Sequence, residues 1–266
     1  MYGGLVMPFE TLGESSLATA RTLLVGGPNT QKSTALLTWP KPVHVISAPG
    51  EKGHETLRGA DGVKVYVWGT DKPESISPYR VVSEVEELVF GIVGGKHGEC
   101  RTLAIDGVHK MFGWYYRRAR MQVESWAGAD KMTEDVKGLR AYNPAYDEFQ
   151  LFMTRVLQSP VPYVVMTVWE DRTKDNPEDM KSPTHIFPDL PGKMAKWIVG
   201  EFSLVLYSEV GLPDPRGNIR GEWTTKPIGK VWGVGVKVAP SRATAIPNKL
   251  PNNFAALAKV LGEPEA

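Results

Sequence analysis

A glycine-rich turn between an apolar run and a helical segment constrains this chain more than any other feature. The stretch Thr22–Thr34 is typical of a short buried strand, a turn that opens at Gly26, and a helix that begins at Lys32. This layout follows the P-loop pattern G-x-x-x-x-G-K-[ST]. In such a loop, backbone N–H groups and the positive end of the following helix surround a polyphosphate. An ordinary strand–turn–helix connection is the alternative.

The predicted nucleotide-binding residues are those of the turn and of the start of the helix: Gly26, Gly27, Pro28, Asn29, Thr30, Gln31, Lys32, Ser33 and Thr34. We expect Lys32 to reach the β- and γ-phosphates of a bound nucleotide, and Ser33 to ligate Mg²⁺ through its hydroxyl. Gln31 stands where the second glycine of the pattern belongs, and its Cβ can narrow the phosphate cradle. Nucleotide binding is therefore predicted more firmly than rapid hydrolysis.

Length and composition bound the class of protein. A chain of 266 residues with 42% hydrophobic and 23% charged residues is typical of a globular protein. The formal net charge of +1 demands neither nucleic acid nor an anionic membrane as partner, although a local basic patch stays open. The single cysteine, Cys100, excludes an internal disulfide and is typical of a reducing cytoplasm. No apolar run reaches the roughly 18–20 residues of a membrane span, so we expect no membrane association.

Apolar or β-branched runs alternate with helical patterns along the chain. The predicted strands are 22–26, 43–48, 63–68, 102–105, 163–168 and 203–207, and the predicted helices are 32–39, 78–93, 146–157 and 253–261. Near-continuous apolar strands separated by helices are typical of a parallel sheet that is covered on both faces. We therefore predict an α/β fold with a mostly parallel central sheet flanked by helices. Two segments, 125–140 and 171–191, are predicted to be long loops.

The end of the chain follows a different pattern. Residues 221–225 and 230–238 alternate well enough to predict a terminal β-hairpin, which a short helix follows. We expect one domain over residues 1–266, with a core at about 20–210 and this extension at about 211–266.

Three further positions are predicted to complete a nucleotide site. Asp106 ends an apolar strand and is expected to hold the hydration shell of Mg²⁺, with a strand-end turn as the alternative. Glu51 follows the second strand, where a carboxylate faces the crevice of an open α/β sheet, and is the candidate general base. Glu55 stands behind it, and both can instead be solvated loop residues. Thr167 is predicted to hydrogen-bond the γ-phosphate, unless neighbouring backbone satisfies it.

The segment Trp114–Arg120 interleaves aromatic residues with Arg117, Arg118 and Arg120. This mixture suits single-stranded nucleic acid, since arginine binds phosphates and aromatic rings stack on bases. It equally suits a helix that buries its aromatic residues and uses its arginines at a subunit interface. The five histidines are scattered, and no histidine metal site is predicted.

Together these residues resemble the phage-encoded ATPases with a RecA-like core, which include single-strand annealing proteins of the Sak type. The resemblance covers roughly residues 20–255 and rests on the order and spacing of these elements: the P-loop, Glu51, the Asp106 strand, Tyr163–Glu170, and the segments 187–193, 203–207 and 241–247. It implies a RecA-like P-loop core that binds ATP with Mg²⁺ and hydrolyses it. It also implies action on single-stranded DNA in phage recombination or replication, in the cytoplasm of the infected bacterium.

The resemblance further implies where partners lie. In related cores the loops after the fourth and fifth strands face DNA, which here are the regions 117–140 and 171–191. In a homo-oligomeric ring or filament, three cations are candidates to reach the nucleotide of a neighbouring subunit: Lys226, Lys230 and Arg242.

Two positions depart from the pattern of this family. Gln31 replaces the glycine before the P-loop lysine, and Trp169 stands where a small or polar sensor residue, often histidine, is expected. These departures leave a different class open, namely a degenerate P-loop protein with a structural or assembly role and little or no turnover of ATP. A small-molecule kinase with the same loop is a third hypothesis.

Overall fold

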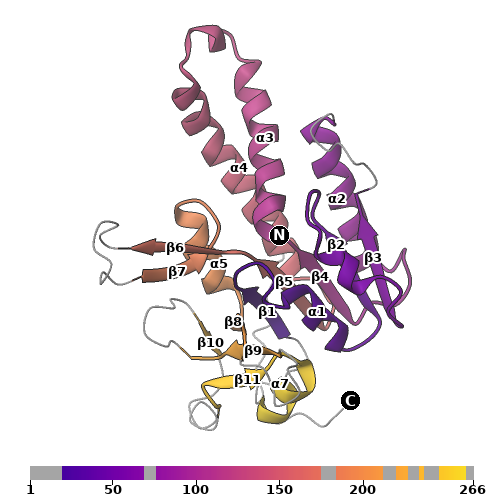
Figure 1. The fold of residues 1–266 in the computed structure, drawn as a ribbon. Helices are drawn as coiled ribbons and strands as arrows, with labels where there is room; N and C mark the ends of the chain where they lie inside the picture. Colours follow the sequence, from indigo (N-terminus) through magenta and orange to yellow (C-terminus); the bar gives the residue numbers. More distant parts are fainter. Residues whose placement is uncertain are drawn as a thin grey trace, which may run out of the picture.

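The computed structural model describes residues 20–68, 76–174, 184–211, 220–226, 234–236 and 246–261. Figure 1 shows the elements in chain order. The strands are β1 (Ala20–Val25), β2 (Val43–Ser47), β3 (Val63–Val67), β4 (Thr102–Asp106), β5 (Tyr163–Val168), β6 (Glu170–Lys174), β7 (Thr184–Pro188), β8 (Leu204–Val210), β9 (Gly221–Thr224), β10 (Gly235–Val236) and β11 (Lys249–Pro251). The α-helices are α1 (Lys32–Ala35), α2 (Pro78–Val93), α3 (Val108–Glu124), α4 (Glu134–Leu157), α5 (Lys193–Glu201) and α7 (Phe254–Leu261). Short 3₁₀ turns cover Leu36–Thr38, Gly53–Leu57 and Ala129–Lys131.

The central sheet has nine strands in the order β11-β9-β8-β1-β5-β4-β2-β3, and β10 pairs with β8. The six strands from β8 to β3 are mutually parallel, whereas β9, β10 and β11 pair antiparallel. Val25 is in register with Val168, and Asp106 with both Thr167 and Ser47. The carboxyl ends of four neighbouring strands therefore meet at one edge. This topology confirms the predicted α/β fold with a mostly parallel sheet.

Both faces of the sheet are buried, which explains the near-continuous apolar strands. Side chains alternate between the faces along each strand, so that Leu23 and Leu103 join a core under α2, α3, α4 and α5. Their neighbours Leu24 and Ala104 join a second core on the opposite face, which α1 and α7 cover. The P-loop strand is thus fixed from both sides.

Helices α3 and α4 form an antiparallel pair that projects away from the sheet, which we call the α3–α4 arm (Figure 1). The prediction of a long loop at 125–140 is wrong for its last part, residues 134–140, because α4 already begins at Glu134. The Thr133 side chain caps this helix by accepting a hydrogen bond from the N–H of Val136. An ion pair of 2.6 Å between Arg118 and Glu148 joins the two helices.

In the described parts of the chain, no helix has the length and apolar character needed to cross a membrane.

Two further predictions are corrected by the strand pairing. The predicted loop 171–191 contains most of β6 and all of β7, which pair antiparallel in a small separate sheet, while residues 175–183 lie outside the described part. The predicted pairing of 221–225 with 230–238 is also wrong for the described residues. β9 pairs with β8 and β11, and β10 pairs with β8. The open edge of β8 therefore determines where these strands lie.

Arg21 ties the P-loop strand to the end of α4. Its guanidinium donates hydrogen bonds to the carbonyl oxygens of Leu157 at 2.6 Å and Ser159 at 2.8 Å. It also donates to those of Val161 and Pro162, each at 3.0 Å. Burial lowers the pKa of Arg21. This one side chain satisfies four backbone acceptors where α4 turns into β5.

We expect Arg21→Met to lower the free energy of unfolding by about 3 kcal/mol, because it leaves partly buried carbonyl groups without their donor. Denaturant unfolding of the purified variant measures this change. Arg101→Met, at an exposed position before β4, serves as the matched control and should change the same quantity by less than about 0.5 kcal/mol. Equal stability of the two variants would contradict the role given to Arg21.

Candidate functional site

The P-loop connects β1 to α1 at the carboxyl edge of the sheet. Gly26 is tightly packed, since a Cβ at this position would overlap the carbonyl oxygen of Ser208. Asn29 and Gln31 have φ angles of 61° and 62°. This left-handed conformation is one that residues other than glycine rarely adopt. The loop therefore follows a glycine-like path at the position where the sequence lacks the second glycine.

Lys32 is buried and folds back over the loop. Its Nζ donates hydrogen bonds to the carbonyl oxygens of Gly26 and Gly27, each at 2.6 Å, and to Thr30 Oγ1 at 3.3 Å. Burial lowers the pKa of Lys32 to about 8. Three carboxylates oppose this shift, those of Asp106, Glu51 and Glu170. The ammonium group is thus held in the loop, close to acidic groups from three other elements.

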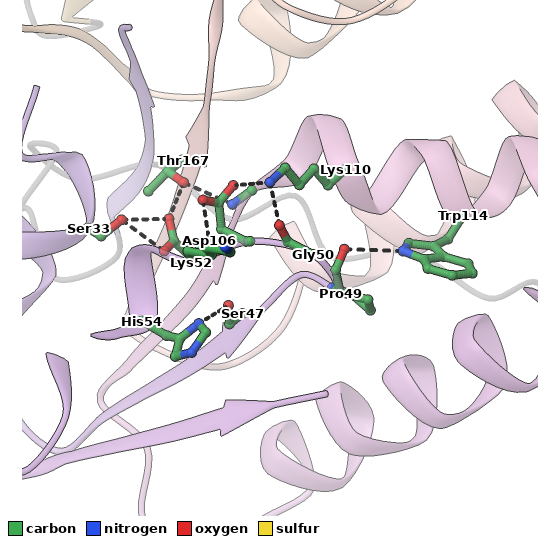
Figure 2. Close-up of polar contacts among 12 residues, drawn as sticks. Ser33, Ser47, Pro49, Gly50, Lys52, His54, Asp106, Lys110, Trp114 and Thr167 are labelled. Atoms are coloured by element: carbon green, nitrogen blue, oxygen red, sulfur yellow. Dashed lines mark hydrogen bonds and ion pairs between the residues drawn. The ribbon is translucent and has the colours of Figure 1, made fainter. Parts of the chain in front are cut away.

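Asp106 lies between Ser33 and Thr167, as Figure 2 shows. Its Oδ2 accepts a hydrogen bond from Ser33 Oγ at 2.9 Å, and its Oδ1 accepts one from Thr167 Oγ1 at 2.5 Å. Thr167 Oγ1 in turn accepts one from the N–H of Gly107 at 2.9 Å. Burial raises the pKa of Asp106, and the two hydroxyl donors counteract that effect. The two predicted metal ligands, Ser33 and Asp106, are therefore in contact.

A hydroxyl and a carboxylate oxygen are the ligand types that Mg²⁺ prefers. The residues present therefore fit a magnesium ion. Across the described residues, no cluster of three or more histidine, cysteine or acidic side chains suggests another kind of metal site.

Gly53 is a site residue that the sequence did not reveal. A Cβ at this position would overlap Ser33 Oγ and would lie 2.5 Å from Asp106 Oδ2. Only glycine allows the backbone after Glu51 to approach the Ser33–Asp106 pair so closely. The two glycines that bracket Glu51 and Lys52 in the sequence were the available signal.

Glu51 faces the same space as the P-loop. A cavity of about 420 Å³ is lined by residues 28–34 and by Glu51, Asp106, Thr167 and Trp169. Glu51 Oε1 accepts a hydrogen bond from the N–H of Lys52 at 3.0 Å, and its Oε2 lies 3.6 Å from Lys110 Nζ. Its side chain is only 11% exposed. The solvated alternative therefore does not describe Glu51.

Glu55 has different surroundings. Its side chain is 58% exposed and pairs with Arg58 at 3.2 Å. Glu55 is not among the residues that line the cavity. Between the two candidate bases, the geometry favours Glu51.

Trp169 forms a wall of the cavity and contacts the first turn of α3. Its ring stacks on that of His109 with centroids 4.8 Å apart, and Lys110 Nζ lies 5.1 Å from the Trp169 centroid. Burial lowers the pKa of His109 to about 4, so the imidazole is neutral at physiological pH. Lys110 also donates a hydrogen bond to the carbonyl oxygen of Gly50 at 2.5 Å, which Figure 2 shows. Lys110 thus joins α3 to the loop that carries Glu51.

Glu170, the next residue, lies beside the P-loop. Its Oε2 accepts a hydrogen bond from the hydroxyl of Tyr207 at 2.5 Å, and Arg172 pairs with its Oε1 at 2.6 Å. A Cβ at Gly27 would lie 3.2 Å from Glu170 Oε1. No pattern in the sequence indicated that Glu170 packs against the phosphate-binding turn.

The arginines of α3 have different roles in the fold. Arg118 pairs with Glu148 of α4, and Arg120 pairs with Glu124 and Glu134. Arg117 is exposed, and its guanidinium lies over the ring of Trp114, 4.7 Å from the centroid. Trp114 and Tyr115 are themselves buried. This fits the alternative in which the segment packs its aromatic residues, and it leaves Arg117 directed to the surface.

The proposed trans-acting cations lie in the C-terminal extension. Lys226 follows β9 and is half-buried. Lys230 and Arg242 lie outside the described residues.

A family described as AAA domain matches residues 18–241. The chain belongs to the AAA domain family. With β5 between the P-loop strand and the Asp106 strand, the topology of this AAA domain confirms the predicted RecA-like P-loop core. None of the curated proteins compared is significantly similar in sequence.

Two of the similar solved structures are archaeal proteins. The flagellar accessory protein FlaH of Methanocaldococcus jannaschii is 10% identical, with 87% of this chain and 84% of that chain covered and a TM-score of 0.38. The KaiC-like protein PH0186 of Pyrococcus horikoshii OT3 is 11% identical, with the same coverages and a TM-score of 0.38.

The lowered pKa of Lys32 predicts a pH dependence of nucleotide binding. A triphosphate attracts the charged ammonium and not the neutral amine, so affinity should fall as pH rises through about 8. The loss should approach about tenfold per pH unit, the limit for one linked proton. Titration of ATP from about pH 7 to about pH 9.5 measures it, with Lys32→Arg as a control that stays charged over this range. If the ATP affinity of the wild type stays constant over this pH range, the Lys32 ammonium does not have the predicted role in nucleotide binding.

Proposed function

We propose that this protein binds ATP with Mg²⁺, hydrolyses it, and acts on single-stranded DNA. The observation that supports the first two steps is the convergence of five side chains on one cavity at the carboxyl edge of the sheet. These are Lys32, Ser33, Glu51, Asp106 and Thr167. Membership of the AAA domain family supports the same conclusion.

Each side chain has a role that follows from its position. The Lys32 ammonium would exchange the carbonyl oxygens of its own loop for phosphate oxygens, which carry a full charge. Ser33 and Asp106 would hold Mg²⁺, which when bound compensates the charge of the phosphates. Thr167 would keep the Asp106 carboxylate in place through its hydroxyl.

Glu51 would accept the proton of the attacking water, since its carboxylate lies at the cavity and is largely shielded from solvent. Lys110 would hold this carboxylate near the start of α3 through the contact of 3.6 Å. The base is thereby linked to the helix that forms one half of the α3–α4 arm.

Substitutions of the two loop glutamates distinguish these roles. Glu51→Gln should reduce the rate of ATP hydrolysis by about 100-fold or more, because it removes the base. Its ATP affinity should change by less than about twofold, since the amide keeps the shape of the side chain. Glu55→Gln is the matched control and should leave both quantities unchanged.

Lys32→Ala should abolish ATP binding.

The outcomes separate the two classes of function. If Glu51→Gln hydrolyses ATP at the wild-type rate, Glu51 is not the base. If the wild type binds ATP but shows no turnover, the alternative of a degenerate P-loop with a structural or assembly role gains support.

The proposed action on single-stranded DNA rests on the resemblance to annealing proteins and on what adjoins the nucleotide cavity. The α3–α4 arm begins at the second residue after Asp106, and β6 begins directly after Trp169. Arg117 is exposed on the arm beside a cavity of about 310 Å³ that includes Tyr116. A cation next to a partly exposed ring suits a phosphate and its base. A homo-oligomer in which Lys226 reaches a neighbouring nucleotide is part of this proposal.

Arg117→Ala should weaken binding of a single-stranded oligonucleotide. The slope of log affinity against log salt concentration should become shallower by about 0.7, the value for one phosphate contact on a single strand. Titrations at several salt concentrations measure this slope. Arg101→Ala, at the opposite edge of the sheet, is the control and should keep the wild-type slope. Identical slopes for Arg117→Ala and the wild type would remove Arg117 from the DNA contact.

A further inference from the structure

Two residues of the C-terminal extension, Gly221 and Asn252, contact Gln31 of the P-loop. The side chain of Gln31 accepts a hydrogen bond, through Oε1, from the N–H of Gly221 at 2.9 Å. Asn252 donates from Nδ2 to the carbonyl oxygens of Gln31 at 3.3 Å and of Thr30 at 3.5 Å. The N–H of Asn252 also donates to the carbonyl oxygen of Gly221 at 3.0 Å. We call Gln31, Gly221 and Asn252 the clasp.

The clasp acts at the position where this P-loop departs from the usual pattern. Gln31 has a φ of 62° and a ψ of 22°, a conformation that is unfavourable for a residue with a Cβ. Compensating contacts are therefore needed to hold it. The fit around Gly221 is close, because a Cβ there would lie 2.9 Å from Gln31 Oε1 and 2.7 Å from Asn252 Nδ2.

A second layer of contacts joins the same C-terminal segment to the helix after the P-loop. The N–H of Phe254 donates a hydrogen bond to Thr38 Oγ1 at 2.9 Å. The ring centroids of Trp39 and Phe254 are 4.9 Å apart, and both residues belong to the core under α1 and α7. The phosphate-binding turn and the end of the chain are therefore joined by both polar and apolar contacts.

We propose that Gln31 is a positioning residue, and that the clasp holds the P-loop amides in the arrangement that accepts phosphate. The C-terminal strands then form a structural part of the nucleotide site. Because coupling between two sites is reciprocal, a nucleotide in the loop also stabilises the clasp. This inference rests on the proposed binding of ATP. It adds to that proposal a coupling between the nucleotide site and the segments β9 and α7.

Two substitutions of Gln31 test the clasp separately from backbone strain. Gln31→Gly restores the usual P-loop pattern, and Gln31→Asn keeps an amide on a shorter side chain. Glycine and asparagine both tolerate the left-handed conformation, but neither carries an amide oxygen far enough to reach Gly221. We expect each variant to bind ATP about five- to tenfold more weakly, the effect of one lost hydrogen bond that orders the loop.

Asn252→Ala should weaken ATP binding to a similar extent. Asn248→Ala, an exposed position in the same segment, is its matched control and should bind as the wild type does. If Gln31→Gly binds ATP as tightly as the wild type or more tightly, the inference is overturned, because the usual glycine then suffices.

Hydrogen exchange at the Gly221 amide gives a readout that loss of stability alone would not produce. In the wild type, ATP should slow exchange of this amide, which donates to Gln31. In Gln31→Gly, ATP at a saturating concentration should not slow it. If the wild type fails to bind ATP, the proposed function fails. If the wild type binds ATP but its Gly221 amide does not respond, the clasp alone is refuted.

Discussion

The buried carboxylate of Asp106 is the group on which the arrangement of the carboxyl edge depends. It is only 2% exposed, and removing a carboxylate from water is costly unless hydrogen bonds replace the lost solvent. Ser33 and Thr167 supply these bonds from two other elements. The parallel register places Thr167 beside Asp106 because β5 lies next to β4. Burial of this carboxylate therefore requires both that Ser33 lies at the start of α1 and that β5 lies next to β4.

The segments that leave this edge connect it to the rest of the molecule. Gly107 follows Asp106 with a φ of 91°, and a Cβ there would lie 2.9 Å from Glu51 Oε2. The chain therefore turns sharply into α3 while leaving room for the proposed base. Lys110 then joins α3 to Glu51 and approaches the ring of Trp169. Residues that line the cavity therefore also contact the start of the α3–α4 arm and directly precede β6.

Local patterns predicted the central strands and the P-loop correctly because each is largely determined by neighbouring residues. β2, β4 and β5 are buried along their whole length, and most of their residues are therefore apolar. Segments without such burial were missed. β6 and β7 pair in a separate two-stranded sheet and carry many polar residues. The first part of α4 buries only Ala141 and Ala145, and Glu134 pairs with Arg120 of α3. This part therefore lacks the apolar stripe that would have indicated a helix.

The C-terminal extension illustrates the same limit. Alternation in 221–225 indicated a strand correctly, but a strand pattern does not name its partner. β9 lies between β8 and β11 because β8 offers an open edge next to the P-loop strand. The clasp depends on this placement, since Gln31 and Gly221 are 190 positions apart in the sequence.

By itself, the sequence determined that a P-loop follows β1 and that a carboxylate ends a buried strand, since both depend on local backbone conformation and local burial. Only the tertiary structure decided which glutamate faces the cavity, why residue 53 is glycine, and how Gln31 is held in a left-handed conformation. The physical reason is that these features arise from contacts between distant segments. Strand register and side-chain packing bring those segments together, and no local pattern encodes the partner.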